Sequence, residues 1–100
     1  EIDIANPKSN KNSPGFTQQE RDSFTKLLEG GFVDVFRHFH KHPHRYTWWS
    51  NFFNSRAKNI GWRLDYHVAS SSLLPRIEDS RILADLYGSD HCPVLLELRD

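Results

Sequence analysis

Apolar residues in this chain occur only in short runs, none longer than three residues, as at Val94 to Leu96. A membrane-spanning helix needs about 20 consecutive apolar residues, so we expect none here. The short runs alternate with polar loops and turns, which favours short strands and helices packed in layers. The sequence therefore predicts an α/β or α+β layered fold.

The composition indicates one small domain, or a piece of a larger one, with a thin hydrophobic core. The 100 residues include 13 Lys and Arg against 13 Asp and Glu, and this neutral balance excludes a histone-like polybasic binder. Removing the 3 Tyr from the 37% hydrophobic count and adding the 5 Gly gives 39%, below the roughly 45–50% of average globular proteins. The chain has no Met and begins in a polar segment, so we expect that Glu1 is not the natural start.

Cysteine usage and the first residues bear on the compartment. Cys92 is the only cysteine, which excludes an intramolecular disulfide and a multi-cysteine zinc site and suits a reducing compartment. The acidic start Glu1-Ile2-Asp3 has the features of neither a signal peptide nor a transit peptide. We expect a protein that works away from membranes.

Local patterns predict the elements of this layered fold. Thr17-Gln18-Gln19-Glu20 is a capping box that begins a helix over 18–29, and Gly30-Gly31 ends it. The other patterns predict a loop over 1–16, one or two helical turns over 32–39, a short strand over 46–49, an exposed loop over 50–61, a strand over 64–69, a turn or helical linker over 70–75, a strand over 77–83, a loop over 88–93 and a strand over 94–98.

Ionisable residues at two strand ends could carry chemistry. The adjacent pair Asp90-His91 offers a hard oxygen ligand for a divalent metal ion and an imidazole that can bind a phosphate. Asp65 lies on the polar face of its predicted strand and could orient that imidazole. The alternative is structural, since an Asp-His pair before Pro93 is also typical of a turn with a capping Asp.

A series of motifs resembles one known family along nearly the whole chain. They are Asn6-Pro7-Lys8, Gly15-Phe16-Thr17, Glu20-Arg21, Tyr46-Thr47-Trp48, Arg56, Lys58-Asn59, Gly61-Trp62-Arg63-Leu64-Asp65-Tyr66 and Gly88-Ser89-Asp90-His91-Cys92-Pro93. The chain resembles the C-terminal part of an exonuclease III-type abasic-site DNA endonuclease, of the branch that includes the major human enzyme. The resemblance implies a four-layer αββα sandwich, the endonuclease/exonuclease/phosphatase fold, with residues 1–100 forming its second half.

The resemblance also implies an activity, which is Mg²⁺-dependent hydrolysis of the phosphodiester 5′ to an abasic site in base excision repair, with Mn²⁺ as an alternative metal. His91 resembles the catalytic histidine that binds the scissile phosphate, and Asp65 the carboxylate that orients it. Asp90 resembles either the carboxylate beside the metal or the one that activates water. Activity as a 3′-exonuclease or 3′-phosphodiesterase is a further expectation for this family.

The remaining candidate residues would contact the DNA. Trp48, Trp62 and Leu64 resemble the apolar pocket that receives the extruded sugar, with core packing as the alternative. Asn10 and Lys11 are expected phosphate binders. The expected partner is double-stranded DNA with abasic sites, bound by a monomer in the nucleus of a eukaryote, with mitochondria as a second location, or in the cytoplasm of a bacterium. Two further cationic residues either contact the DNA backbone or are solvated, and these are Arg56 and Lys58.

Several family residues have no counterpart in this chain. They are the metal-binding Glu, the catalytic Tyr and the Asp-x-Asn motif that precedes the segment matching Glu1. We therefore expect the isolated chain to be inactive. Two other functions stay open, a non-catalytic nucleic-acid-binding module of this fold and a related phosphodiesterase acting on RNA or lipid. Alternate histidines at 38, 40, 42 and 44 could bind a soft metal if extended, although a surface loop is the preferred interpretation.

Overall fold

Helix α1 (Gln18–Glu29) begins and ends where the sequence predicts. We describe residues 1–100 from a computed structural model. The Thr17 hydroxyl oxygen accepts the Glu20 N–H at 3.3 Å, and the same hydroxyl donates to the Glu20 carboxylate at 2.8 Å. The bond from the Thr17 hydroxyl is the main cause of a lowered pKa at the Glu20 carboxyl, and a bond from the Gly15 N–H at 2.9 Å adds to it. Gly31, at φ +97°, supplies the left-handed residue that turns the chain away after the helix.

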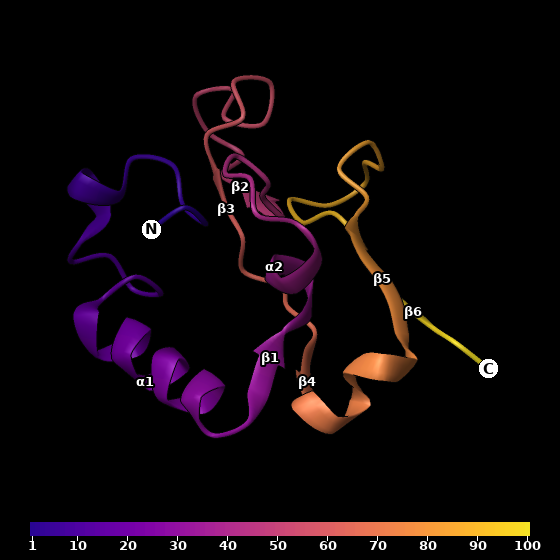
Figure 1. Cartoon of the computed structure of the whole chain (residues 1–100). Coiled ribbons are helices and arrows are strands. Elements are labelled where there is room, and N and C mark those ends of the chain that lie inside the picture. Colours follow the sequence, from indigo (N-terminus) through magenta and orange to yellow (C-terminus); the bar gives the residue numbers. More distant parts are fainter.

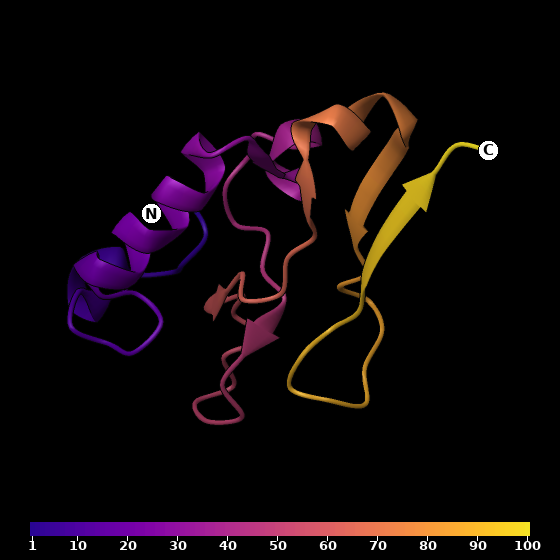
Figure 2. The ribbon, with the colours of Figure 1, turned by 90° about the horizontal axis from the view of Figure 1, so that it is seen from below.

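Three antiparallel pairs of short strands follow the helix (Figures 1 and 2). Each pair joins two segments that are distant in the sequence or separated by a long loop. The pairs are β1 (Phe32–Asp34) with β4 (Val68–Ser70), β2 (Trp48–Trp49) with β3 (Gly61–Trp62), and β5 (Ile77–Ile82) with β6 (Val94–Leu98). The short helices are η1 (Pro7–Asn10), α2 (Val35–Phe39) and η2 (Ser71–Arg76). The longest helix has 12 residues, and no helix is long and apolar enough to cross a bilayer.

Several predicted elements differ in the structure. The helical turns expected over 32–39 begin only at Val35, because residues 32–34 pair with β4 and Asp34 then caps α2 by accepting the Arg37 N–H. The strand expected over 64–69 is paired only from Val68. The amides of Leu64 and Asp65 instead donate to the side-chain hydroxyl of Thr47, so residues 64 and 65 pair with no neighbouring strand.

The N-terminal segment is more ordered than the predicted loop. Ile4 is 5% exposed and forms an isolated bridge with Trp62. Backbone bonds on both sides of it, Arg63 N to Asp3 O at 2.7 Å and Ala5 N to Gly61 O at 2.9 Å, hold the segment along β3. Burial of the Ile4 side chain explains the difference, since a single apolar residue among polar ones gives little signal in the sequence.

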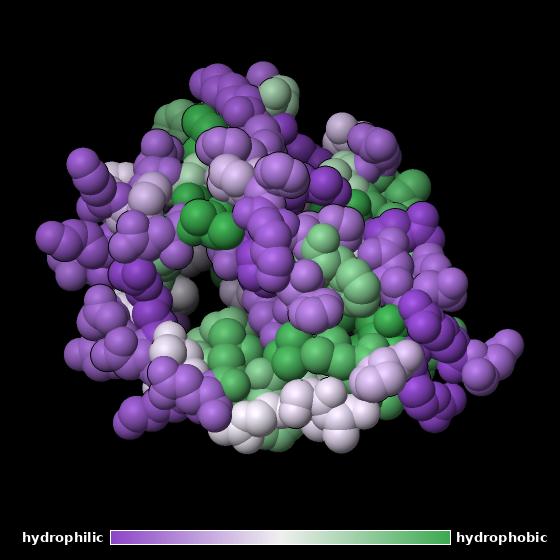
Figure 3. Space-filling model, viewed as in Figure 1, coloured by the Kyte–Doolittle hydropathy of each residue, from purple (hydrophilic) through white to green (hydrophobic).

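The core is thin, as the composition predicts, because only 16 of the 100 residues are buried. One cluster contains Phe36, Tyr46, Trp49, Ile82 and Cys92, and a second contains Val35, Ala69 and Ile77. Helix α1 has no buried residue, and apolar side chains gather on the surface near the lower centre of Figure 3, over the region of β1 and β4. The better-packed part of the molecule is therefore the part around β2 and β5.

Candidate active site

The candidate site is assembled around the two-residue strand β2. On one side Trp48 and Trp49 pair with Trp62 and Gly61 of β3. On the other side Trp48 forms a bridge with His91, and Trp49 N donates to Asp90 O at 3.1 Å. The two signature segments, which are far apart in the sequence, therefore flank the same short strand.

Asp65 and His91 form a hydrogen-bonded pair. Asp65 Oδ2 lies 2.8 Å from His91 Nδ1, which confirms that the two side chains are in contact. The segments that carry them are not neighbouring strands, because β2 runs between these segments and Asp65 lies beyond the end of β3. Their side chains are 38% and 42% exposed, so the pair lies at the surface. A carboxylate on Nδ1 fixes the ring's orientation and leaves Nε2 to meet a substrate.

Asp90 is held beside this pair by an indole. Trp48 Nε1 donates to Asp90 Oδ2 at 3.0 Å, and Ser89 Oγ donates to Oδ1 at 3.3 Å. The hydrogen bond from Trp48 is the main reason that the pKa of Asp90 lies below its ordinary value. Asp90 is therefore ionised at neutral pH and ready to act as an oxygen ligand or as a base.

The three apolar candidates lie next to these polar groups. Trp48 and Trp62 meet edge to face, with ring centroids 6.3 Å apart at 87°, and Phe16 packs edge-on against Trp62 at 6.4 Å. Both tryptophans are only partly buried, and Leu64 is 37% exposed. Their open surfaces agree better with a wall that contacts a ligand than with core packing, although their role stays a prediction.

Comparison with known proteins identifies the group to which the chain is related. The family model described as "Endonuclease/Exonuclease/phosphatase family" matches residues 2–91.

The chain belongs to this family.

Two curated relatives and two solved structures extend the match. The chain is 56% identical over 97 residues to an exodeoxyribonuclease of Bacillus subtilis and 52% identical over 99 residues to the DNA repair nuclease APEX1 of Danio rerio. These alignments cover 96% and 98% of the chain but 38% and 32% of the relatives, so the chain spans about a third of their length. An AP endonuclease of Archaeoglobus fulgidus superimposes with a TM-score of 0.88 at 31% identity, over 97% of this chain and 40% of that one. The AP endonuclease of Leishmania major gives 0.80 at 39%, over 86% and 26%.

These matches confirm two predictions from the sequence. The chain has the endonuclease/exonuclease/phosphatase fold, of which it forms a part, and its relatives are nucleases that act on DNA.

A metal ion would find one ligand here but no complete site. The Asp90 carboxylate is the kind of hard oxygen donor that Mg²⁺ and Mn²⁺ prefer. No group of three or more His, Cys, Asp or Glu side chains is arranged to hold a metal ion anywhere in the chain. The histidines at 38 to 44 form no such group either, and His40 Nε2 lies 2.7 Å from the Ser80 carbonyl oxygen.

The predicted DNA-binding side chains are engaged to different degrees. Lys11 and Lys58 are exposed and form no ion pair, whereas the Asn10 side-chain amide donates to Ala5 O at 3.2 Å and to Asn6 O at 2.9 Å. Arg56 binds three carbonyls, of Ala84, Leu86 and Ser89, and lies between two aromatic rings, Trp49 and Tyr87. A phosphate contact by Arg56 would have to share a guanidinium that already joins two loops. The DNA-binding role of all four stays a prediction.

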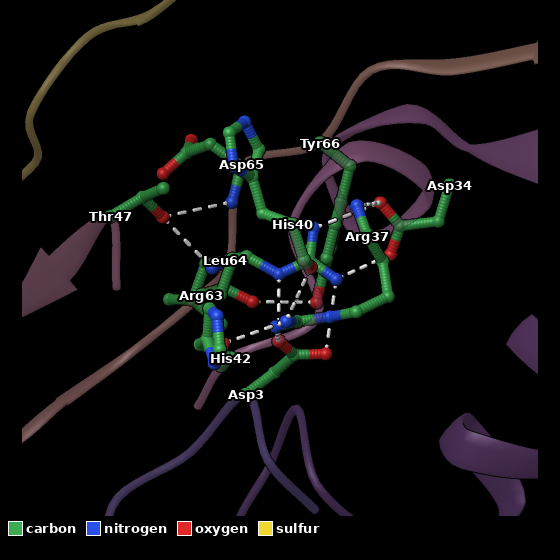
Figure 4. A network of polar contacts seen from close by, with 10 residues as sticks. All are labelled: Asp3, Asp34, Arg37, His40, His42, Thr47, Arg63, Leu64, Asp65 and Tyr66. Atoms are coloured by element: carbon green, nitrogen blue, oxygen red, sulfur yellow. Dashed lines mark hydrogen bonds and ion pairs between the residues drawn. The ribbon is translucent and has the colours of Figure 1, made fainter. Parts of the chain in front are cut away.

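An ion network around Arg63, in the same segment as Asp65, was not predicted from the sequence (Figure 4). Arg63 is 1% exposed and binds the carboxylates of Asp34, which is 8% exposed, and Asp3, whose side chain is 31% exposed. Arg37 also binds Asp3. Burial alone would lower the pKa of Arg63, but hydrogen bonds to the two carboxylates outweigh it and raise that pKa. Burial of Arg63 inside the signature segment could not be predicted, because Arg is seldom fully buried.

Proposed function

We propose that the protein containing this chain is a DNA repair nuclease that hydrolyses the phosphodiester 5′ to an abasic site. The observation that carries the proposal is the 2.8 Å contact between Asp65 and His91, with ionised Asp90 next to His91 in the loop that borders β2. An oriented imidazole beside a carboxylate suits phosphoryl chemistry. The names of the relatives, which are exodeoxyribonucleases and AP endonucleases, support this choice of reaction.

The polar groups divide the chemistry between them. His91 binds the scissile phosphate through Nε2, and Asp65 keeps the ring in the required tautomer by accepting from Nδ1. Asp90 acts either as a metal ligand or as the base that takes a proton from the attacking water. Positioned charge of this kind stabilises the pentavalent transition state in which negative charge builds on the phosphoryl oxygens.

Mg²⁺, or Mn²⁺ in its place, would offset that negative charge when bound. Asp90 would supply one ligand, and the other ligands would come from parts of the protein that this chain does not contain. The isolated chain should therefore be inactive.

The apolar wall would select the substrate. The partly buried rings of Trp48 and Trp62, with Leu64 beyond them, offer a flat apolar surface to a sugar that carries no base. A normal nucleotide is too large for such a slot. We propose abasic double-stranded DNA as the substrate of a monomer, with 3′-exonuclease or 3′-phosphodiesterase activity as a secondary reaction, in the nucleus and mitochondria of a eukaryote or in the bacterial cytoplasm.

The test uses a hybrid in which this chain replaces the matching 97 residues of the Bacillus subtilis exodeoxyribonuclease. The hybrid should nick a duplex with one abasic site when Mg²⁺ is added, and His91→Ala or Asp65→Ala should slow it. The unaltered relative and a Lys26→Ala hybrid, changed on the exposed face of α1, serve as controls. A folded hybrid that binds abasic DNA without nicking it would favour the non-catalytic binding module, and nicking by the isolated 100-residue chain would contradict the predicted inactivity.

A further inference from the structure

Thr47 occupies an unusual position directly before β2. Its side chain is fully buried, at 0% exposed, between the aromatic residues Tyr46 and Trp48. Its backbone joins both halves of the candidate site, since Thr47 N donates to Trp62 O at 3.0 Å and Cys92 N donates to Thr47 O at 2.8 Å. A buried apolar residue such as Val would fit the same backbone bonds, so these bonds alone do not explain the hydroxyl.

The hydroxyl oxygen makes two contacts that an apolar side chain cannot make. It accepts the N–H of Leu64 at 2.9 Å and the N–H of Asp65 at 3.1 Å (Figure 4). The structure gives these amides no other acceptor, because the β2–β3 ladder ends at Trp62. One side-chain oxygen therefore replaces the strand carbonyls that would otherwise bind this part of the chain.

The amides that the Thr47 hydroxyl binds belong to two residues of the candidate site. Asp65 is one of the two residues whose amides it binds, and the side chain of Asp65 reaches His91. The other amide belongs to Leu64, a candidate wall residue. His91 is fixed from the opposite side, through the Cys92 N–H on the Thr47 carbonyl. Thr47 thus holds the backbone next to both Asp65 and His91, although it bonds to neither of their side chains.

We propose that Thr47 is a positioning residue, whose hydroxyl sets the place of the Asp65 carboxylate relative to His91. The inference rests on the proposed function. Reacting groups held about 1 Å out of place can lose on the order of 10²-fold in rate, so a single anchoring oxygen is enough to matter. Thr47 itself makes no contact with substrate or metal in this scheme.

Two substitutions in the hybrid separate the hydroxyl from the shape of the side chain. Thr47→Val keeps the shape and removes the acceptor, and Thr47→Ser keeps the acceptor. Thr47→Val should lower kcat by about 10- to 100-fold with KM changed less than about threefold, and Thr47→Ser should stay within about threefold of the parent. Ser80→Ala, which alters a buried hydroxyl residue at 2% exposed in β5, is the matched control and should leave kcat unchanged.

A double-mutant cycle distinguishes positioning from general loosening. If Thr47 acts through Asp65, Thr47→Val should have little further effect on kcat in an Asp65→Ala background. An equal decrease in both backgrounds would overturn the proposal. So would a folded Thr47→Val hybrid with the parent's kcat, or a folded Thr47→Ser hybrid with the Val variant's loss.

Amide hydrogen exchange gives a readout that does not depend on activity. In the Thr47→Val hybrid the amides of Leu64 and Asp65 should exchange faster while those of β5 keep their protection, and unchanged protection at Leu64 and Asp65 would overturn the proposal. If Thr47→Val does not fold, the test uses the Thr47→Ser hybrid, by its kcat and by the hydrogen exchange of the Leu64 and Asp65 amides. Failure of the proposed function has a different signature, because the parent hybrid would then lack activity although Leu64 and Asp65 stay protected.

Discussion

Removal of Arg63 should destabilise the fold far more than removal of an exposed arginine. Arg63 is 1% exposed, and its guanidinium binds Asp34, which is itself 8% exposed. In an Arg63→Leu variant Asp3 keeps Arg37 as a partner, but the Asp34 carboxylate keeps only the backbone N–H of Arg37, at 3.4 Å. An uncompensated buried charge of this kind costs about 3–5 kcal/mol, which is a large part of a typical total stability of about 5–15 kcal/mol.

The assay is guanidinium unfolding of the hybrid, followed by tryptophan fluorescence and by circular dichroism. The control is Arg81→Leu, because the Arg81 side chain is 50% exposed and pairs with Glu97 at the surface. Removing this ion pair should lower the free energy of unfolding by about 0–1 kcal/mol. Replacing both partners, Arg63→Leu with Asp34→Leu, should recover much of the loss because no buried charge is then left alone. A cost below about 1 kcal/mol for Arg63→Leu, or a double variant less stable than the single one, would refute the argument.

Three further predictions concern the hybrid. Trp62→Ala should lower kcat/KM on abasic DNA by roughly 5- to 150-fold, the equivalent of about 1–3 kcal/mol of stacking. It should lower the free energy of unfolding by less than the about 3–5 kcal/mol typical of removing a buried aromatic side chain. A large decrease in the denaturation midpoint with near-normal cleavage would show that Trp62 belongs to the core. Gly61→Ala should destabilise β2 and β3 in thermal melts, because an added Cβ would lie 2.6 Å from the Trp48 carbonyl oxygen, and an unchanged melting temperature would contradict this. Burial would raise the pKa of Asp3, but hydrogen bonds to Arg63 and Arg37 outweigh burial and lower that pKa. The ionised Asp3 carboxylate therefore contributes stability above about pH 4, and this contribution is lost as pH falls through the folded-state pKa. Asp3→Asn should make the free energy of unfolding fall less steeply with decreasing pH, and an equally steep fall would count against the ion network.

Local rules predicted the elements whose signals lie within a few residues. The capping box at Thr17 and the glycine pair after Glu29 fixed both ends of α1. The spacing of apolar residues over 32–39 fits a helix, but pairing with β4 takes residues 32–34 into a strand. Tertiary pairing of this kind overrides a local pattern and leaves no mark in the segment itself.

The contact between Asp65 and His91 was predicted from the polar positions of the two residues at strand ends and from the family resemblance, because their separation in the sequence alone gives no sign of it. Roles that depend on backbone partners were harder to predict. The alternation over 64–69 gives no sign that a hydroxyl from Thr47 will replace the ladder. Likewise, Arg56 resembles a DNA contact in the sequence, yet its carbonyl partners could be any residues, and only the fold shows that it joins two loops.

The position of β2 between two remote segments bears on how the site forms during folding. The Asp65–His91 contact joins residues 26 positions apart, and the two amide contacts of Thr47 span 17 and 18. Closing such loops costs entropy before any contact repays it, whereas α1 is stabilised by bonds between near neighbours. We therefore expect α1 to form early, and the candidate catalytic pair to assemble late, when the Asp90–Cys92 segment docks on β2. In the hybrid, slow folding would then delay the appearance of activity more than it delays the appearance of helix content.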